Sequence, residues 1–523
     1  STAPCLKERA GVYKQNTAPP RPRFQKTIRR RNLTLQTPPS YIKEAIAMKR
    51  TSPQYYAQHK WSILAVLIFM PFMAMLDSTI VNVALPVMVK DLGTDMQSVQ
   101  MVVIAYLIAV VASILLFGRM GDILGKGRLF MFGTVVFTVG SLMAGLSHDL
   151  NTLIIARVIE GIGGAAALAN NQGIITEVFP ANERGRALGF SGVSVALGTM
   201  AGPALGGLIV TYLNWNYIFL INVPVGIIGF ILALRLMPRG IKSKEKLDYR
   251  GAAALAATVI LFFFALLTGA KVGYQKYYII ISFIAAVGFM ALFLFLEKRS
   301  AQPIIDLSLF KNSLFTISIV CVLIQFFAIS GISIIQPFYV EDVLKTDPAQ
   351  TGLIMMSLPI VLGIVSPIAG YISDKIGATK ITLAGLIIMT LGLFLLSTMT
   401  ASEPIYKLVI YLSVVGLGAG IFSAPNTSLI MSTAPKEKLG ITGSINAFTR
   451  NLGSVIGISL LTTLLYSLMS AKVGHTVDGF VAGQPNVFVY GMRIVYLVGV
   501  ALLIISVILT IIRLFQNKKL KRP

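Results

Sequence analysis

Among the ionisable side chains inside long apolar segments of this 523-residue sequence, where such groups are rare, three could do chemistry. Asp77 lies in one apolar run, and Arg157 and Glu160 lie three positions apart in another. A charge in the hydrocarbon core of a membrane costs at least ~2.5 kcal/mol, so a carboxyl there takes up a proton or finds a cation. Groups of this kind suit a site that gains and loses protons or meets a cationic compound.

Each of these residues also has a structural interpretation. Asp77 can serve as a hydrogen-bonded packing residue, with Asn82 as a second one. Arg157 and Glu160 share one helix face and can neutralise each other, which fits a structural ion pair as well as a titrating second carboxylate. The sequence alone leaves open which acid carries a proton.

The sequence lacks the residues that metal binding, enzymatic catalysis or ATP hydrolysis would require. His59, His148 and His475 are scattered, and Cys5 and Cys321 stand far apart, so we predict no metal site. An enzyme would need clustered nucleophiles, bases or metal ligands, and an ATP-driven pump would need the phosphate-loop motif, which is absent from the sequence. We therefore predict no enzyme and no cofactor, with a proton gradient as the driving force.

The segments that hold these groups have the length of transmembrane helices. The sequence is 55% hydrophobic and only 13% charged, which fits no ordinary soluble domain. Its apolar runs of about 18 or more residues match helices that cross a hydrocarbon core of roughly 30 Å. We predict an all-α integral membrane protein with 14 transmembrane helices. The ninth is predicted over Leu314 to Val340, and spans nine and ten contain no acidic residue.

Basic residues are distributed unevenly between the predicted loops. If both termini are cytoplasmic, the outer loops hold only a few of the 45 Lys and Arg residues. These few are Lys90, Lys271, Lys276, Lys345, Lys407, Lys472 and Arg493. The asymmetry follows the positive-inside rule and predicts a multi-pass protein of the plasma membrane, the bacterial inner membrane, with both termini cytoplasmic. It also explains most of the net charge of +24 through anionic lipids, so membrane lipids are expected partners and nucleic acid is not.

Two loops share a pattern that indicates an internal duplication. Both read G-x3-D-x2-G with a cation ten residues after the first glycine, and they follow spans two and ten. The residues are Gly118, Asp122, Gly125, Lys126 and Arg128 in the first loop, and Gly370, Asp374 and Gly377 in the second. We infer two six-helix pseudo-repeats with two inserted central helices between them.

This alignment sets the expected domain boundaries. A basic cytoplasmic segment at residues 1–60 is predicted to be disordered. The other segments are an N-terminal six-helix bundle at 61–240, two inserted transmembrane helices at 241–300, a C-terminal six-helix bundle at 301–515 and a basic cytoplasmic tail at 516–523.

The paired loops are candidates for gating. Glycine allows a tight turn between two helices, and the loop carboxylate can lie against a helix N-terminus or a neighbouring arginine. Such a contact can exist in one conformation and break in another. For either loop alone, a plain helix-connecting turn is the alternative interpretation.

Together these features resemble the major facilitator superfamily, and the fourteen-span layout resembles its drug/proton antiporter branch. Leu76–Pro86 is similar to the first-helix signature of that branch, and Gly118–Arg128 to the family's loop between helices two and three. Arg157 matches an arginine that the family ties to proton coupling, with Glu160 where glutamine is usual. The resemblance implies that Asp77, Arg157 and Glu160 act in proton coupling.

A glycine pattern in the fifth span is the feature most specific for export. The resemblance covers approximately residues 60–515, and this span has the spacing of the antiporter signature, which implies antiport and not uptake. Glycines four apart let helices approach closely, and a proline removes a backbone hydrogen bond and kinks the helix. The motif consists of Gly189, Gly198, Gly202, Pro203, Gly206 and Gly207.

Polar and aromatic residues of other spans are candidates for the substrate cavity, although residues at helical spacing also serve packing. They are Asn171, Gln172, Gln325, Phe326, Gln336 and Phe422. In span thirteen, Arg450–Gly453 looks like a second-half counterpart of a first-half motif.

The resulting hypothesis is a monomeric, proton-coupled multidrug exporter, associated with antibiotic resistance, whose halves rock around a midplane cavity. Protonation of Asp77, with Glu160, favours the outward-facing state, and proton release to the cytoplasm resets it. A membrane carboxylate with few basic partners suits lipophilic cationic drugs or toxic compounds as the small-molecule substrate. The alternatives are a dedicated exporter of one metabolite, antibiotic, lipid or siderophore, and a non-transporting receptor or scaffold with the same fold.

Overall fold

The computed structural model describes residues 53–180, 183–237, 247–300, 303–305, 307–433, 439–477 and 479–520. Fourteen helices of this part are long and apolar enough to cross a membrane. The protein is therefore an all-α integral membrane protein, as the sequence predicts. Most of the predicted N-terminal segment and the last three residues of the predicted tail lie outside the described residues.

The helices follow one another in the order expected from the sequence. The first six spans are α2 (Pro53–Asp91), α3 (Met96–Val99) with α4 (Met101–Leu124), α5 (Lys126–Gly145), α6 (Leu150–Val178), α7 (Arg184–Tyr212), and α8 (Tyr217–Leu220) with α9 (Asn222–Leu236). The next two are α10 (Tyr249–Val272) and α11 (Tyr277–Arg299). The last six comprise η1 (Leu307–Lys311), α12 (Ser313–Phe338), η2 (Tyr339–Val343), α13 (Pro348–Met355), α14 (Ser357–Ile376), α15 (Ala378–Ser397), α16 (Ile405–Ser432), α17 (Leu439–Val473) and α18 (Pro485–Leu520).

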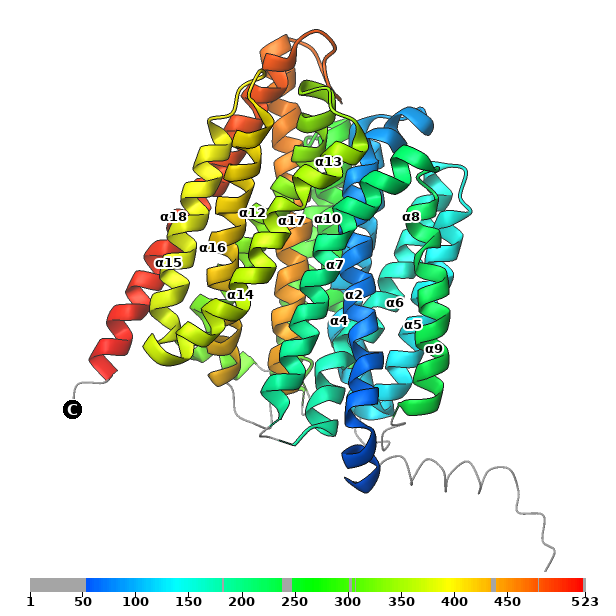
Figure 1. The fold of residues 1–523 in the computed structure, drawn as a ribbon, viewed down its shortest axis with the longest axis vertical. Helices are drawn as coiled ribbons and strands as arrows, with labels where there is room; N and C mark the ends of the chain where they lie inside the picture. Colours follow the sequence, from blue (N-terminus) through cyan, green and yellow to red (C-terminus); the bar gives the residue numbers. More distant parts are fainter. Residues whose placement is uncertain are drawn as a thin grey trace, which may run out of the picture. The chain divides into compact units, whose positions relative to one another are not determined.

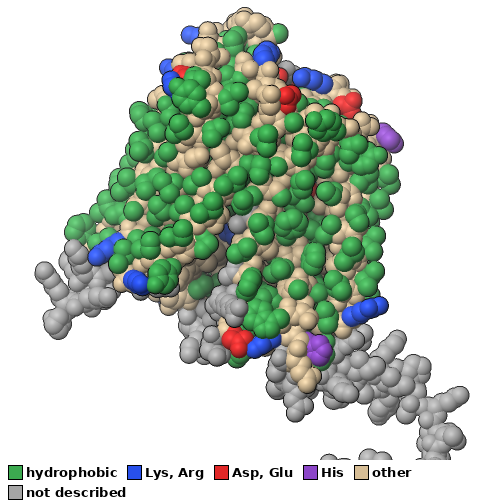
Figure 2. All heavy atoms as spheres, in the orientation of Figure 1, with side chains coloured by type: hydrophobic (Ala, Val, Ile, Leu, Met, Phe, Trp, Pro, Cys, Tyr) green, Lys and Arg blue, Asp and Glu red, His purple; other side chains and the backbone are tan. Residues whose placement is uncertain are grey.

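The helices from α2 to α9 form one group, here the N-terminal half, and those from α12 to α18 form another, the C-terminal half (Figure 1). We call the end with the α4–α5 and α14–α15 junctions the basic end, after Lys126, Arg128, Lys375 and Lys380. The other end carries α13 and is called the α13 end. Helices α7 and α14 meet near the α13 end and diverge toward the basic end (Figure 1). The space-filling view shows a hollow between the halves there (Figure 2).

The two helices between the halves form a hairpin of their own. α10 packs along α11 and also contacts α4 and α17, which belong to different halves. α11 carries many exposed apolar side chains, among them Ile281, Ile284 and Val287. In a membrane these side chains face lipid, which is why an exposed apolar helix is stable here.

The internal duplication extends beyond the two loops that indicate it in the sequence. Gly125 and Gly377 occupy equivalent loop positions 252 residues apart, and their backbones agree, with φ 102° and ψ 118° at Gly125 and φ 97° and ψ 126° at Gly377. Gly133 of α5 and Gly385 of α15 have the same offset, and each lies against the backbone of the following span. The two halves therefore repeat a helix–turn–helix unit with its packing.

One feature of the ninth span differs from the sequence-based expectation. α12 continues without interruption into the π-helical turn η2, so the apolar column runs from Ser313 to Val343. It therefore contains Glu341, which is 8% exposed, and Asp342. The predicted span ended at Val340, before the first charge, whereas the helical column continues past it to Val343.

Candidate functional site

A cluster of buried ionisable groups lies inside the N-terminal half. Asp77 is on α2, while Arg157 and Glu160 are on α6, and the side chains of all three are fully buried. Nη1 of Arg157 donates to Oδ2 of Asp77 at 2.7 Å and to Oε2 of Glu160 at 2.6 Å. One guanidinium nitrogen thus joins two carboxylates, one on its own helix and one on a neighbouring helix.

Two neutral side chains complete the hydrogen bonding of the carboxylates. The Ser141 hydroxyl on α5 donates to Oε1 of Glu160. Nδ2 of Asn222 on α9 donates to Oδ1 of Asp77 at 3.2 Å and lies 3.4 Å from Oγ of Ser141. The cluster therefore draws on four helices of the N-terminal half, α2, α5, α6 and α9.

Aromatic rings and a backbone carbonyl surround the guanidinium. The Arg157 Cζ lies 4.4 Å from the ring centre of Tyr106 and 5.4 Å from that of Phe219. Its Nε donates to the carbonyl of Val102 at 3.1 Å. This carbonyl and the two rings, all from α4 or α8, exclude water from the charged groups, which strengthens their electrostatic interactions.

The charges of the cluster do not balance when both acids are ionised. Asp77 and Glu160 then contribute two negative charges against the single positive charge of Arg157. A buried unpaired charge costs several kcal/mol, and binding of one proton makes the cluster neutral. The arrangement can therefore hold one exchangeable proton.

The first predicted gating loop lies beside the start of α17 in the other half. Asp122 pairs with Lys126 at 3.0 Å, and both line a small cavity together with Gly443 and Ser444 of α17. Gly118 also faces Ser444. The first loop thus lies against the other half of the protein.

The rest of the two loops is turn-forming and cationic. Nη1 of Arg128 donates to the Leu124 carbonyl at 3.2 Å. In the second loop, Gly370 contacts α16, Gly377 has the positive φ already noted, and the side chain of Asp374 lies outside the described residues. A gating role for these residues stays a prediction.

The predicted antiporter motif places α7 between the two halves. Gly198, Gly202 and Gly206 face α2, where a Cβ would meet Phe72, Thr79 and Ile80 respectively at 2.9 Å or less. Gly207 and Pro203 face α13 on another side of the same helix. Gly189 lies nearer the basic end of α7. The glycines thus let α7 contact both the turn of α2 that carries Asp77 and a helix of the C-terminal half.

The six predicted cavity residues do not gather at one place. Asn171 donates to the Leu67 carbonyl at 2.9 Å, and Gln325 donates to Oγ of Ser423 at 2.9 Å. Gln172 lies against Gly443 of α17. Gln336 and Phe422 are fully buried, while Phe326 is partly exposed. Their role in substrate binding stays a prediction.

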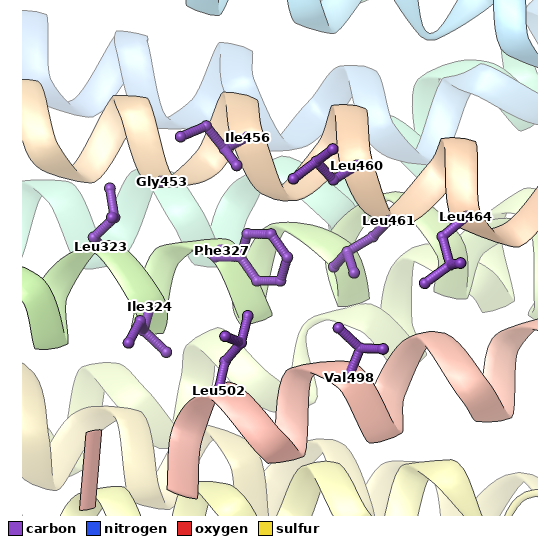
Figure 3. Close-up of a pocket in the computed structure, with 10 residues that line it drawn as sticks. All are labelled: Leu323, Ile324, Phe327, Gly453, Ile456, Leu460, Leu461, Leu464, Val498 and Leu502. Carbon is purple, nitrogen blue, oxygen red and sulfur yellow. The ribbon is translucent and has the colours of Figure 1, made fainter. Parts of the chain in front are cut away.

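A separate cavity lies elsewhere, in the C-terminal half. It has a volume of about 520 Å³ and lies between α12, α17 and α18. Its lining side chains converge from these three helices (Figure 3). The lining residues are Leu323, Ile324, Phe327, Gly453, Ile456, Leu460, Leu461, Leu464, Val498 and Leu502. All are apolar or glycine, so the cavity suits a hydrocarbon or aromatic group.

Several residues of the buried cluster carried no signal of their role in the sequence. Ser141 and Tyr106 are ordinary residues of apolar helices, and only the resulting structure brings them to Glu160 and Arg157. Asn222 stands within the sixth span, and an amide inside an apolar segment is the one signal that could have indicated a buried partner. No group of three His, Cys, Asp or Glu side chains in the described ranges is placed to hold a metal ion.

Comparison with known proteins agrees with this architecture. A family model described as Major Facilitator Superfamily matches residues 67–458 and 319–522. The riboflavin transporter RibZ of Clostridioides difficile (strain 630) is 35% identical over 413 residues, which cover 78% of this chain and 88% of the relative.

Two relatives are named as multidrug resistance proteins. Stp of Mycobacterium tuberculosis (strain CDC 1551 / Oshkosh) is 31% identical over 77% of this chain and 75% of its own length. Multidrug resistance protein 3 of Bacillus subtilis (strain 168) is 29% identical over 82% of this chain and 84% of its own length. With its fourteen spans, its duplicated halves and these matches, the chain belongs to the major facilitator superfamily of membrane transporters.

Proposed function

We propose that this transporter is a proton-coupled exporter in which Asp77, Arg157 and Glu160 form the proton site. The observation that carries the proposal is the single guanidinium nitrogen of Arg157 between two buried carboxylates. Such a cluster changes its net charge by one when a proton binds, and that change is expensive enough to bias a conformational equilibrium.

Asp77 is the carboxylate whose protonation changes contacts between helices. Its bond to Arg157 joins α2 to α6, whereas Glu160 and Arg157 stand three residues apart on the same helix. When Asp77 is protonated, Arg157 and Glu160 remain as a neutral pair. The ion pair that joins α2 to α6 is then lost. Protonation of Glu160 instead leaves the connection between α2 and α6 in place.

Helix α7 can transmit this change to the contact between the halves. Its glycines lie against Phe72, Thr79 and Ile80, on the turns of α2 that flank Asp77, and its Gly207 lies against Pro348 of α13. A movement of α2 therefore shifts α7 against the C-terminal half at the α13 end. Interfaces this closely packed have discrete arrangements and do not deform gradually.

The proposed direction of transport combines the orientation in the membrane with antiport. We place the protein in the plasma membrane with the basic end and both termini in the cytoplasm, in line with the positive-inside rule. Protons then enter from the α13 end and leave at the basic end, while substrate moves the opposite way. Closure of the α13 end by α7 and α13 corresponds to a state that is not open to the outside.

Lipophilic small molecules are the proposed substrates, because two of the relatives are named as multidrug resistance proteins. The name of a third relative, a riboflavin transporter, makes a dedicated exporter the competing function. The sequence-based argument for cationic substrates depended on a carboxylate with few basic partners. Because Asp77 and Glu160 both contact Arg157, this cluster no longer favours a cation over other compounds.

Proton flux in liposomes tests the proposal. Purified protein is reconstituted with an internal pH dye, and an inward proton gradient is imposed while tetraphenylphosphonium, riboflavin and a dansyl-labelled fatty acid are added in turn. Substrate-dependent proton flux is expected for the wild type and for Glu160→Gln, with at least a tenfold loss in Asp77→Asn. Glu403→Gln, a partly buried carboxylate between α15 and α16 that pairs with Lys407, is the control and keeps full flux.

Equal losses in Asp77→Asn and Glu160→Gln would assign the proton to the pair of carboxylates and not to Asp77 alone. Two results would contradict the proposal. Undiminished flux in Asp77→Asn would remove this residue from coupling. Substrate movement that proceeds without any proton flux in the wild type would overturn proton coupling itself.

A further inference from the structure

Arg450 is a cation inside the C-terminal half for which the proton site gives no role. It lies on α17, about 14 Å along the helix from the start of the apolar span at Ile441, which is near the middle of a hydrocarbon core of about 30 Å. No acidic side chain of the described residues pairs with it or lies close enough to interact electrostatically. An ionisable residue at this depth without a counter-charge marks a functional site.

Two arginines that are fully buried in the described spans have their partners within the protein. Arg157 contacts two carboxylates. Arg513 of α18 is fully buried and donates to Oγ of Ser318 at 2.8 Å and to Oγ1 of Thr382 at 2.6 Å. Arg450 differs from both, because it stays partly exposed and the side chain that covers it is an aromatic ring, not an acceptor.

A close crossing of two helices holds Arg450 in place. A Cβ on Gly453 would lie 2.5 Å from the carbonyl of Leu323, and one on Gly457 would lie 2.4 Å from the carbonyl of Phe327, so α17 touches the backbone of α12. One turn before this crossing, the Cζ of Arg450 lies 4.8 Å from the ring centre of Phe326. The ring covers one face of the guanidinium and leaves its N–H edges for a ligand.

Phe326 belongs to a stripe that faces space between helices. α12 packs against α2, α16, α17 and α18, yet Phe326, Ile329 and Ser333 are all only partly buried. Their spacing of three and four residues places them on one face of α12. Arg450 therefore reaches a face of α12 that neighbouring helices do not fill.

The apolar cavity of about 520 Å³ begins at the same helix crossing. Leu323 and Gly453 line it (Figure 3). In the sequence they lie within one turn of Phe326 on α12 and of Arg450 on α17. Its lining offers no polar side chain, so it accommodates only an apolar group. A cation with free donors thus lies beside a cavity that suits hydrocarbon.

We propose that Arg450 and this cavity bind an amphiphilic organic anion, with its acid group on the guanidinium and its apolar body between α12, α17 and α18. The proposal names the substrate class of the transporter and so rests on transport being its function, but it does not depend on proton coupling. An exported compound and an anionic membrane lipid share this chemistry. Planar acid groups match the donor edge of an arginine, which makes the contact stronger than a contact with a lysine.

Binding of two matched probes tests the site in the full-length protein, in nanodiscs of phosphatidylcholine alone. The probes are dansyl-labelled undecanoate and dansyl-labelled undecylammonium, which have the same apolar body and opposite charge. Dansyl fluorescence is expected to report binding of the anion at least tenfold tighter than that of the cation. Arg450→Gln is expected to remove this preference, and Arg450→Lys to restore part of it.

Two further variants distinguish binding at this site from general effects of a substitution on the protein. Arg299→Gln is the matched control, because Arg299 also lies over a ring, that of Phe295 at 4.2 Å, but is exposed on α11. It is expected to bind both probes as the wild type does. Leu460→Trp fills the cavity from a lining residue that is 39% exposed and is expected to weaken both probes at least fivefold. Undiminished anion binding in Arg450→Gln, or equal binding of both probes by the wild type, would overturn the proposal.

The source of the anion is decided by two arms of the same experiment. If the site takes a membrane lipid, phosphatidylglycerol in the nanodisc displaces the dansyl anion, and liposomes show no transport of it. If the site takes a substrate, the dansyl anion is transported and Arg450→Gln abolishes that transport. Asp77→Asn is expected to keep the binding preference, so failure of proton coupling and failure of this site give different results.

Discussion

Gly207 of α7 faces the backbone carbonyl of Pro348 in α13 so closely that a Cβ atom on Gly207 would lie 2.4 Å from that oxygen. On the opposite side of this contact, a Cβ on Gly352 would lie 2.2 Å from the carbonyl of Pro203. The two halves of the transporter therefore meet at the α13 end through backbone atoms that have no side chain between them. This contact exists only while both positions are glycine.

Gly207→Leu is expected to shift the transporter away from the state closed at the α13 end. The added side chain cannot fit against Pro348, so the halves must separate there. A cysteine introduced at Ala349, in a Cys5→Ser background, should react with a membrane-impermeant maleimide at least fivefold faster than without the leucine. Gly192→Leu on the same helix, with nothing within 4 Å of its Cβ position, is the control, and equal rates in all three proteins would contradict the contact.

Gly125→Ala and Gly377→Ala are expected to lower the stability of the protein to a similar extent. Both glycines have a φ near 100°, which residues with a Cβ adopt at a cost of about 1–3 kcal/mol. Thermal unfolding in detergent should show a lower midpoint for each. Gly192→Ala, inside α7, should not lower it, because alanine favours the helix by about 1 kcal/mol. A large effect at only one loop position would mean that the two turns are not equivalent.

Arg157→Gln is expected to destabilise the protein far more than Asp77→Asn. The first change leaves two buried carboxylates without a cation, which costs about 3–5 kcal/mol. The second leaves a neutral pair of Arg157 and Glu160, and the amide still accepts a hydrogen bond, so a cost of about 1 kcal/mol or less is expected. Unfolding midpoints of the two variants, measured in the same detergent, give the order directly. If Asp77→Asn destabilised the protein more than Arg157→Gln, groups other than Arg157 would have to compensate the negative charge of Asp77.

Asn222→Leu is expected to weaken the proton site without removing a charge. It deletes the donor that lies 3.2 Å from Asp77, and an unsatisfied buried acceptor costs about 1–3 kcal/mol. Substrate-dependent proton flux should fall severalfold without being abolished, because the site loses a hydrogen bond while its charges remain. Asn216→Ala, which deletes a donor to the carbonyls of Gly145 and Ser147, is the control and should leave the flux unchanged.

The buried cluster shows how far local spacing predicts a site. Arg157 and Glu160 are three residues apart, so helix geometry alone predicted their contact, and the structure confirms it. The contact between Asp77 and Arg157 joins residues 80 positions apart, and only the packing of α2 against α6 produces it. Ser141 joins the same cluster without any signal, because a serine within an apolar helix most often bonds its own backbone.

The polar cavity residues mark the limit of such predictions. Asn171 and Gln325 were singled out because amides are unusual in apolar helices, yet both donate to groups of neighbouring helices, Leu67 and Ser423. In a membrane a polar side chain has few other partners, so helix contacts use it first. Arg450 has no acidic partner among the described residues, and it was noted in the sequence only as part of a motif.

The hairpin of α10 and α11 keeps the number of membrane crossings between the two duplicated loops even. Every crossing reverses the direction of the polypeptide, so the turns at Gly125 and Gly377 lie at one end of the bundle only if an even number of crossings separates them. A single extra helix would turn the second half upside down and carry Lys375 and Lys380 to the opposite face. Helices can therefore be inserted between two such halves only in even numbers. The two helices found here are the smallest insertion that leaves both duplicated units facing the same compartment.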